Sequence, residues 1–271
     1  MARKKVLVTG ANSGIGLACV LELARRDFDA IGTVRSQAKA RVIRDAARDA
    51  GVNVRVALLD VTNAQACRRV IERERPFGLV NNAGTSFTGA VEDVDDATAR
   101  AALETMVLAP MRLARLALPH MREAGEGRIV NVSSIYGRTS TPLTGWYQAA
   151  KQALEGASDA LRMEIAGAGI HVVLVEPGAV ETGLWGAADD DLSRQGSRYE
   201  EAYRRARVGI RLTERIRASA DQVARAVADA MRARSPRPRY LVGLDAQWAA
   251  LLDRVAPTWI SDRVKRLPLG L

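Results

Sequence analysis

The chain has 271 residues, 48% apolar and 26% charged, and its 40 Lys and Arg outnumber its 31 Asp and Glu to give a net charge of +9. These values are typical of a globular protein and exclude a wholly disordered chain, a collagen and a coiled coil. No apolar run approaches the roughly 20 residues that span a bilayer, and the first residues lack the apolar core and cleavage site of a signal peptide. We therefore expect no transmembrane segment and one large α/β domain over residues 1–271.

Two cysteines and two histidines limit the chemistry that this chain can carry. Cys19 and Cys67 are too few for a disulfide framework, and we interpret them as buried, reduced thiols of a cytoplasmic protein. The two histidines argue against a zinc site of the usual type, so we expect no metal. The arginines are spread along helical patterns beside acids, which favours a solvated basic surface and no nucleic-acid partner. A patch at 232–239 for a nucleic acid or an anionic membrane is the alternative.

Short apolar runs alternate with longer helical patterns along the chain. The runs that predict strands are residues 6–9, 29–34, 54–59, 78–81, 128–133, 170–176 and 239–242. The patterns that predict helices are residues 15–26, 37–50, 63–75, 97–123 and 146–166. The strands are continuous apolar runs, so both faces of the sheet should be covered. This alternation predicts right-handed crossovers and a parallel, doubly wound sheet.

Residues 184–218 interrupt this alternation, because they are polar and helical in pattern and carry no strand. Ligands bind open α/β sheets beyond the carboxyl ends of the strands. An insertion after the sixth strand lies at that edge, and we interpret it as a lid over a substrate pocket. Residues 246–271 predict an amphipathic, helical tail.

A glycine-rich turn joins the first predicted strand to the first helix. Gly10, Gly14 and Gly16 give the spacing Gly-x3-Gly-x-Gly, which differs from the usual Gly-x-Gly-x2-Gly. Glycines permit a tight turn and the close approach of a phosphate, and the helix N-terminus offers free N–H groups to it. We therefore expect a dinucleotide to be bound here, with a structural turn that holds no ligand as the alternative. The residues expected at its pyrophosphate are Gly10, Asn12, Ser13, Gly14, Ile15 and Gly16.

Residues after the next strands specify which dinucleotide is bound. Arg35 ends the second strand where an NAD-binding protein places an acid, and a guanidinium matches a 2′-phosphate. We therefore expect NADP(H) to be preferred over NAD(H). Asp60, with Val61, is expected near the adenine, although Asp60 alternatively only begins the following turn. Asn82-Ala83-Gly84 forms a second tight turn at the same sheet edge.

Tyr147 and Lys151 are separated by one helical turn, and Ser134 follows the fifth predicted strand. Residues i and i+4 share one helix face. A lysine ammonium favours phenolate, and a tyrosine tuned in this way exchanges protons with an alcohol or a carbonyl oxygen. Ser134 is expected to hydrogen-bond the same substrate oxygen. A solvated helix face is the alternative reading of Tyr147 and Lys151 alone.

These motifs, taken in order, resemble those of the short-chain dehydrogenase/reductase family, closely over residues 4–183 and more loosely to 245. The motifs are Thr9 to Gly16, Asp60-Val61, Asn81 to Gly84, Ser134, Tyr147-x3-Lys151 and Glu176 to Thr182. The resemblance implies a seven-stranded Rossmann fold and hydride transfer at a nicotinamide. It implies that Tyr147 is the acid/base, that Ser134 orients the substrate, and that Lys151 tunes the phenol and binds ribose. It also places Pro177, Gly178, Val180 and Thr182 at the cofactor, with Thr182 on the nicotinamide carboxamide.

The later segments resemble bacterial relatives of steroid and retinol dehydrogenases. Residues 238–246 and the tail carry this resemblance, which implies a steroid-, retinoid- or polyketide-like alcohol or ketone as the substrate. The side chains expected at its pocket are Tyr136, Thr144 and Trp185. The family usually associates through helices that correspond to 97–123 and 146–166, so a homodimer or homotetramer is expected.

Met106 departs from the family pattern, because an asparagine that anchors a water in a proton relay usually stands there. A thioether is a weak acceptor and donates no hydrogen bond. The leading interpretation is an NADP(H)-dependent oxidoreductase of secondary alcohols and ketones. One alternative is a cofactor-binding regulator or scaffold whose catalysis is impaired by Met106. Another is an enzyme that acts with the same residues on a C=C bond or a sugar.

Overall fold

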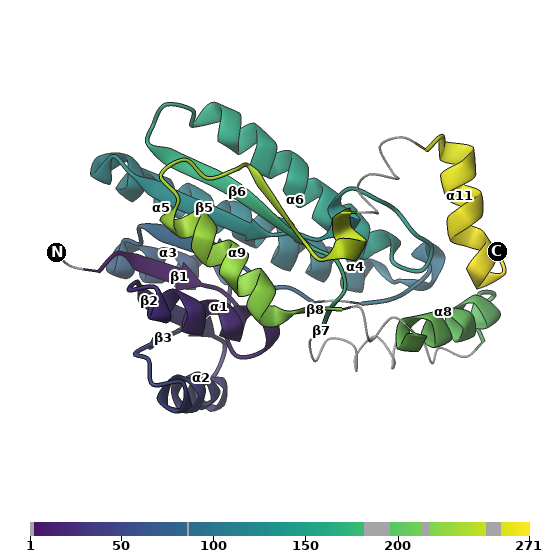
Figure 1. Cartoon of the computed structure of the whole chain (residues 1–271), viewed down its shortest axis with the longest axis horizontal. Coiled ribbons are helices and arrows are strands. Elements are labelled where there is room, and N and C mark those ends of the chain that lie inside the picture. Colours follow the sequence, from purple (N-terminus) through teal and green to yellow (C-terminus); the bar gives the residue numbers. More distant parts are fainter. Residues whose placement is uncertain (1–2, 86, 182–195, 213–216, 248–255) are drawn as a thin grey trace.

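The structure, a computed structural model, is a parallel sheet between two layers of helices (Figure 1). It describes residues 3–85, 87–181, 196–212, 217–247 and 256–271. Thr182, Trp185, the beginning of the expected lid and part of the expected tail lie outside the described residues.

All neighbouring strands of the main sheet pair in parallel, in the order β3-β2-β1-β4-β5-β6-β9. The strands are β1 Lys5–Val8, β2 Asp29–Val34, β3 Arg55–Leu58, β4 Gly78–Asn81, β5 Gly127–Val132, β6 Ile170–Pro177 and β9 Arg239–Val242. This confirms the predicted seven-stranded, doubly wound fold. The strand order reverses between β1 and β4, which is where open α/β sheets bind ligands.

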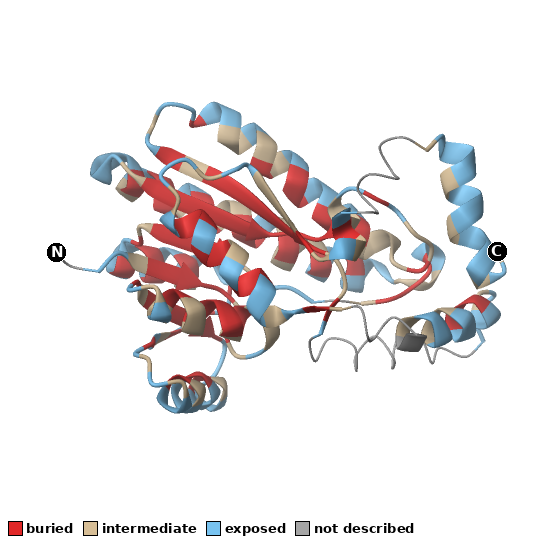
Figure 2. Ribbon diagram, in the orientation of Figure 1, coloured by how far each residue is buried: buried red, intermediate tan, exposed pale blue. Residues whose placement is uncertain are grey.

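Helices cover both faces of the sheet, as the continuous apolar strands predict (Figure 2). Successive residues of a strand face opposite sides. In β1, Val6 and Val8 pack in one apolar cluster with helices α1 and α9, whereas Leu7 packs in the other with α3 and α5. The helices of the main body are α1 Gly14–Arg25, α2 Gln37–Asp49, α3 Ala64–Glu74, α4 Asp96–Leu103, α5 Ala109–Ala124, α6 Gly145–Glu164 and α9 Ala220–Arg232.

The structure corrects the predicted continuous helix over 97–123. Helices α4 and α5 are separated by a π-helical segment, Glu104–Leu108, in which the Ala109 N–H donates to the Glu104 carbonyl. The next residue, Pro110, has no N–H for the carbonyl four residues earlier, and its ring would clash with that carbonyl. The wider turn accommodates the proline, and Met106 lies inside this segment.

The expected lid segment also departs from the prediction at its end. A short parallel pair joins β7, Val180–Glu181, to β8, Ala218–Ser219, so residues 184–218 finish in a strand that the sequence did not indicate. Earlier in the segment, α8, Glu200–Leu212, has the expected helical form. The Tyr203 hydroxyl of α8 donates to Asp93 Oδ2 and accepts from the Ala90 N–H, each at 2.7 Å.

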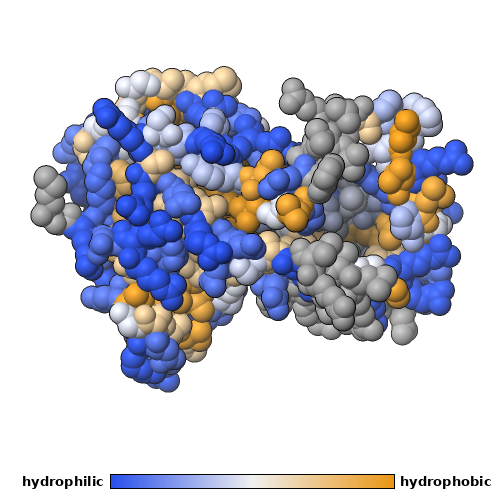
Figure 3. Space-filling model, in the orientation of Figure 1, coloured by the Kyte–Doolittle hydropathy of each residue, from blue (hydrophilic) through white to orange (hydrophobic). Residues whose placement is uncertain are grey.

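The end of the chain packs beside α8. Helix α11, Thr258–Arg266, and the following turn lie next to α8 at the end of the molecule farthest from the N-terminus (Figure 1). Hydrophobic, orange side chains gather at the place of α11 in the view of Figure 3. Along this helix and the turn after it, Val264 is 63% and Leu267 62% exposed. No helix among the described residues is long and apolar enough to cross a membrane.

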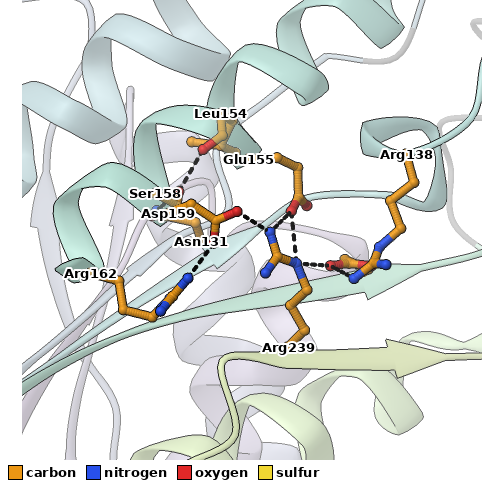
Figure 4. Close-up of polar contacts among 9 residues, drawn as sticks. Asn131, Arg138, Leu154, Glu155, Ser158, Asp159, Arg162 and Arg239 are labelled. Carbon is orange, nitrogen blue, oxygen red and sulfur yellow. Dashed lines mark hydrogen bonds and ion pairs between the residues drawn. The ribbon is translucent and has the colours of Figure 1, made fainter.

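Buried amides link the two central strands to the helix behind them. The Asn81 amide donates to Asn131 Oδ1 at 2.7 Å. The Asn131 amide donates to Ser158 Oγ at 2.8 Å, and that hydroxyl donates to the Leu154 carbonyl at 2.6 Å (Figure 4). Asn131 is fully buried. The chain of bonds fixes α6 against β4 and β5.

We expect Asn131→Ala to destabilise the fold, because it leaves the Asn81 amide and the Ser158 hydroxyl without this partner. Ser158 keeps its bond to the Leu154 carbonyl and the Asn81 amide keeps only a long one to the Pro110 carbonyl, so the main cost is that of the poorly paired Asn81 amide, about 1–3 kcal/mol. Urea unfolding measures the loss, with Asn53→Ala at an exposed loop position as the control. Equal stability of the two variants would contradict a structural role for these bonds.

Candidate active site

Two tight turns at the carboxyl ends of β1 and β4 are hydrogen-bonded to each other. The Asn82 amide donates to the carbonyls of Thr9 at 2.9 Å and Gly10 at 3.2 Å. The Thr9 hydroxyl accepts the backbone N–H groups of Asn82 and Ala83, each at 2.9 Å. A Cβ on Gly16 would lie 2.2 Å from the Gly10 carbonyl oxygen, so no other residue fits there without displacing the turn. These contacts hold the N-terminus of α1 open toward the gap between the strands.

A cleft of about 390 Å³ lies at this reversal of the strand order. Its lining includes every residue predicted to bind the cofactor from the first four strands, namely Gly10, Asn12, Ser13, Gly14, Ile15, Gly16, Arg35, Asp60, Val61, Asn82, Ala83 and Gly84. A glycine turn, an open helix N-terminus and flanking cations fit a dinucleotide phosphate. The sequence reasoning missed further lining residues, namely Thr33, Val34, Lys39, Leu59, Thr62, Thr85 and Thr105.

Charged side chains gather at the end of the cleft beside β2 and β3. Lys39, in the first turn of α2, lines the cleft together with Arg35, which directly follows β2 four residues earlier. The Asp60 carboxylate accepts the Thr62 N–H at 3.0 Å and the Thr62 hydroxyl at 2.8 Å. These two bonds lower the pKa of Asp60 below its ordinary value, with a smaller contribution from Arg35. Asp60 therefore both shapes its own turn and faces the cleft.

Ser134, Tyr147 and Lys151 come together from two elements. Ser134 follows β5 and precedes the short 3-10 helix Ile135–Gly137, whereas Tyr147 and Lys151 stand in the first two turns of α6. The Lys151 ammonium donates to the Val132 carbonyl at 2.8 Å and lies 5.7 Å from the centre of the Tyr147 ring. All three predicted catalytic residues thus share one region, although Tyr147 and Lys151 do not line the cleft itself.

Burial controls the ionisation of both groups on α6. It raises the pKa of Tyr147 to about 12, against a smaller lowering by a hydrogen bond with Ser134. It lowers the pKa of Lys151 to about 8, opposed by the carboxylate of Glu155. The pKa of Tyr147 therefore moves in the opposite direction to the one expected from Lys151, because desolvation of the phenolate dominates. At neutral pH the phenol carries its proton.

The side chains predicted for the substrate pocket differ in their surroundings. The Tyr136 ring packs edge to face on Tyr147, with ring centres 6.2 Å apart. The Thr144 hydroxyl instead accepts from the Gln148 amide and lies 3.1 Å from the Thr141 hydroxyl, so it stabilises the start of α6. The sequence reasoning missed Gln148.

The loop after β6 lies on the other side of Ser134. The Ser134 hydroxyl is 3.5 Å from the Pro177 carbonyl, and Pro177, Gly178 and Val180 do not line the cleft. Asp245, another residue missed from the sequence, accepts the Ala179 N–H at 2.6 Å. A Cβ on Gly178 would lie 2.2 Å from the Asp245 carboxylate, which explains the glycine there.

Met106 lies between the cleft and the predicted catalytic residues. Its side chain is 1% exposed and packs in a small apolar cluster with Ala102, Ala150 and Tyr147. It also contacts Gly84, where an added Cβ would lie 3.5 Å from Met106 Cγ. The position that usually holds a polar amide is thus buried among apolar side chains in this chain.

Comparison with known proteins agrees with this fold and arrangement, which are those of a dinucleotide-binding oxidoreductase. The short chain dehydrogenase family model matches residues 4–193, and the chain belongs to that family. Over 191 residues, 68% of each chain, it is 39% identical to the uncharacterized oxidoreductase YusZ of Bacillus subtilis.

Two solved structures extend the similarity over almost the whole chain. A short-chain dehydrogenase from Streptomyces avermitilis is 31% identical, with a TM-score of 0.80 that covers 100% of this chain and 97% of that one. A variant of actinorhodin polyketide ketoreductase with NADPH is 28% identical, with a TM-score of 0.78 over 91% of this chain and 97% of that one. The family is one of oxidoreductases that act on alcohols and ketones.

We expect Met106→Asn to lower both stability and turnover, because it places an amide among apolar neighbours. An unpaired buried amide costs about 1–3 kcal/mol. Thermal melting and steady-state kinetics measure the two effects, and Met106→Leu, which keeps the apolar contacts, is the matched control. A rise in turnover without loss of stability would instead mean that methionine at position 106 only impairs catalysis relative to the usual asparagine.

Proposed function

We propose that this chain transfers a hydride between NADP(H) and a secondary alcohol or ketone with an apolar body. The observation that carries the proposal is that Met106 lies beside Gly84 of the cleft wall and also belongs to the apolar cluster against which Tyr147 packs. The cleft suits a dinucleotide, and a buried, protonated phenol lies directly behind one end of it.

Different residues of the cleft bind different parts of the cofactor. The N–H groups at the start of α1 bind the pyrophosphate, since the glycine turn leaves them accessible and the helix dipole favours an anion. Arg35 and Lys39 bind the 2′-phosphate, and Asp60 and Val61 border the adenine. Lys151 binds the nicotinamide ribose. Thr182, outside the described residues, remains the proposed partner of the carboxamide.

Bound NADPH supplies the hydride, and this chain supplies the proton and the orientation. Tyr147 carries a proton at neutral pH and donates it to the carbonyl oxygen of a ketone. Ser134, which contacts the same phenol, orients that oxygen. The Lys151 ammonium then favours the phenolate left behind. Reduction is the direction that starts from the protonation state found here.

An apolar substrate and self-association complete the proposal. Tyr136, Met106 and Phe87 give the surroundings of Tyr147 an aromatic and apolar character. The similarity to a polyketide ketoreductase supports the same substrate class.

As expected from the sequence, a cytoplasmic homodimer or homotetramer belongs to the proposal, with α5 and α6 as the contact surfaces.

The second candidate function is a cofactor-binding regulator without useful turnover. Met106 is the observation in its favour, because its thioether, packed in an apolar cluster, is only a weak acceptor and donates no hydrogen bond to a relay water. The buried phenol and ammonium oppose it, since burial of two ionisable groups costs stability that a scaffold does not need.

Cofactor preference is expected to depend on Arg35 and Lys39 together. Loss of one charge-assisted contact costs about 1.5–3 kcal/mol, so Arg35→Ala and Lys39→Ala should each weaken NADPH binding roughly 10- to 150-fold and leave NADH binding nearly unchanged. Fluorescence titration measures both cofactors. Arg41→Ala, at an exposed position of α2 outside the cleft, is the control. Equal affinity of the wild type for both cofactors would refute the assignment.

Chemistry is expected to depend on the Tyr147 phenol. Tyr147→Phe keeps the ring and removes the proton, and loss of a general acid lowers the rate about 10²- to 10⁴-fold. NADPH binding should survive, because the glycine turn is unchanged. Single-turnover measurements test this, with Tyr240→Phe on β9 as the control. Undiminished turnover in Tyr147→Phe would exclude the proposed acid.

A further inference from the structure

Charged side chains lie next to the predicted catalytic lysine, one turn farther along the same face of α6 and on the strands beside it. Glu176 of β6 is fully buried and Glu155 of α6 is 6% exposed. Arg138, which follows the 3-10 helix after Ser134, pairs with both oxygens of Glu176. Arg239 of β9 reaches the same group from the edge of the sheet (Figure 4). The proposed chemistry uses none of these four residues.

Arg239 is shared among three carboxylates. Its guanidinium is 3.0 Å from Glu176 Oε1, 3.1 Å from Glu155 Oε2 and 2.5 Å from Asp159 Oδ2. Asp159 has a further partner in Arg162, at 2.9 Å. Glu155, in contrast, meets only the shared guanidinium among these arginines, so its negative charge is the least compensated of the three.

The position of Glu155 is fixed from several sides. Its Oε2 accepts from Arg239 Nε at 3.3 Å and Nη2 at 3.1 Å, whereas Oε1 is buried without a hydrogen-bond partner. A Cβ on Gly137 would lie 2.8 Å from both Glu155 Cγ and Ser133 Oγ, so the loop that carries Ser134 packs closely against this side chain. Glu155 therefore connects β9 to the segment that positions the predicted catalytic serine.

Lys151 and Glu155 stand one turn apart on the same face of α6. Several elements bring charged and polar groups to this region: Lys151 and Asp159 from α6, Ser133 and Arg138 from the segment after β5, Glu176 from β6 and Arg239 from β9. Burial is the largest influence on Glu155 and raises the pKa of its carboxyl, opposed by Ser133 and Arg239. The two arginines are already engaged by Glu176 and Asp159. Arg239 balances part of the Glu155 charge, and the Lys151 ammonium, one turn away on the same helix, is a second cation that this carboxylate influences.

We propose that Glu155 is a positioning residue for Lys151: its carboxylate, oriented by Arg239, keeps the buried ammonium charged beside Tyr147. This inference rests on the proposed function only for its effect on turnover. Burial alone drives a lysine toward its neutral form. The Glu155 carboxylate opposes that tendency, and the Val132 carbonyl accepts one of the ammonium hydrogens. Arg239 and Gly137 keep the carboxylate in place.

The test follows the ionisation of Lys151 without any substrate. The chain has only five lysines, so protein labelled with 13C-lysine gives few side-chain signals, and Lys151→Arg identifies the one that matters. In the wild type this signal should titrate near pH 8. In Glu155→Gln its midpoint should fall by roughly one pH unit or more, because a neighbouring opposite charge has been removed.

Asp159→Asn is the matched control. This substitution removes another carboxylate of α6 that binds Arg239. Because Arg162 also neutralises the Asp159 carboxylate, its removal should leave the Lys151 midpoint unchanged. Glu155→Asp keeps the negative charge but shortens the side chain by one methylene, so it should lower the Lys151 midpoint by less than Glu155→Gln does. If Glu155→Gln does not fold, the midpoint in Glu155→Asp tests the proposal. An unchanged midpoint in the folded Glu155 variants, or an equal fall in Asp159→Asn, would overturn the proposal.

The pH dependence of turnover gives a second readout. Lys151 acts as a cation, so activity is present below its pKa and is lost as the pH rises through it. Glu155→Gln lowers that pKa and should move the alkaline limb to lower pH. A purely structural role would lower the melting temperature and leave this limb in place. If no ketone is turned over but the lysine titration shifts as expected, the proposed function fails and the role of Glu155 stands.

Discussion

The bonds between Thr9 and Asn82 are the constraint on which the cofactor cleft depends. They join the ends of β1 and β4 at the point where the strand order reverses. Without this connection the two turns would be separate loops, and the N-terminus of α1 would have no fixed wall opposite it. Because Gly16 leaves space for the Gly10 carbonyl, the backbone itself forms the floor of the cleft. The selectivity of the site is then left to side chains at its ends.

The sequence predicted the fold and the cleft well, because both depend on local patterns. Continuous apolar strands identified the parallel sheet, and glycine spacing with Arg35 identified residues that the structure does bring to one cleft. What could not be predicted depends on contacts between distant segments. Asp245 reaches the loop after β6 because β9 pairs with β6. The residues around position 179 give no sign in the sequence that this contact forms.

Two predictions were wrong, one of the helix over residues 97–123 and one of the direction in which the pKa of Tyr147 moves. The interrupted helix at 104–108 follows from Pro110, whose missing N–H and bulky ring disturb the preceding turn. The ionisation of Tyr147 was expected from its neighbour Lys151, but desolvation is the larger effect and depends on how deeply α6 is packed. A sequence shows which charges are close along a helix, and does not show how much water reaches them.

The position of Arg239 near the end of the chain has a consequence for biosynthesis. The first four strands and the lining of their cleft involve residues up to Thr105, so they can assemble while the rest of the chain is still being made. Glu155 and Glu176 gain their shared guanidinium only when β9 joins the edge of the sheet. Glu176 already has Arg138, but Glu155 has no other arginine, and a buried carboxylate without a partner is costly, so the final packing of α6 is favoured only after β9 has joined. A nascent chain is therefore expected to bind nucleotide before it has a finished catalytic centre.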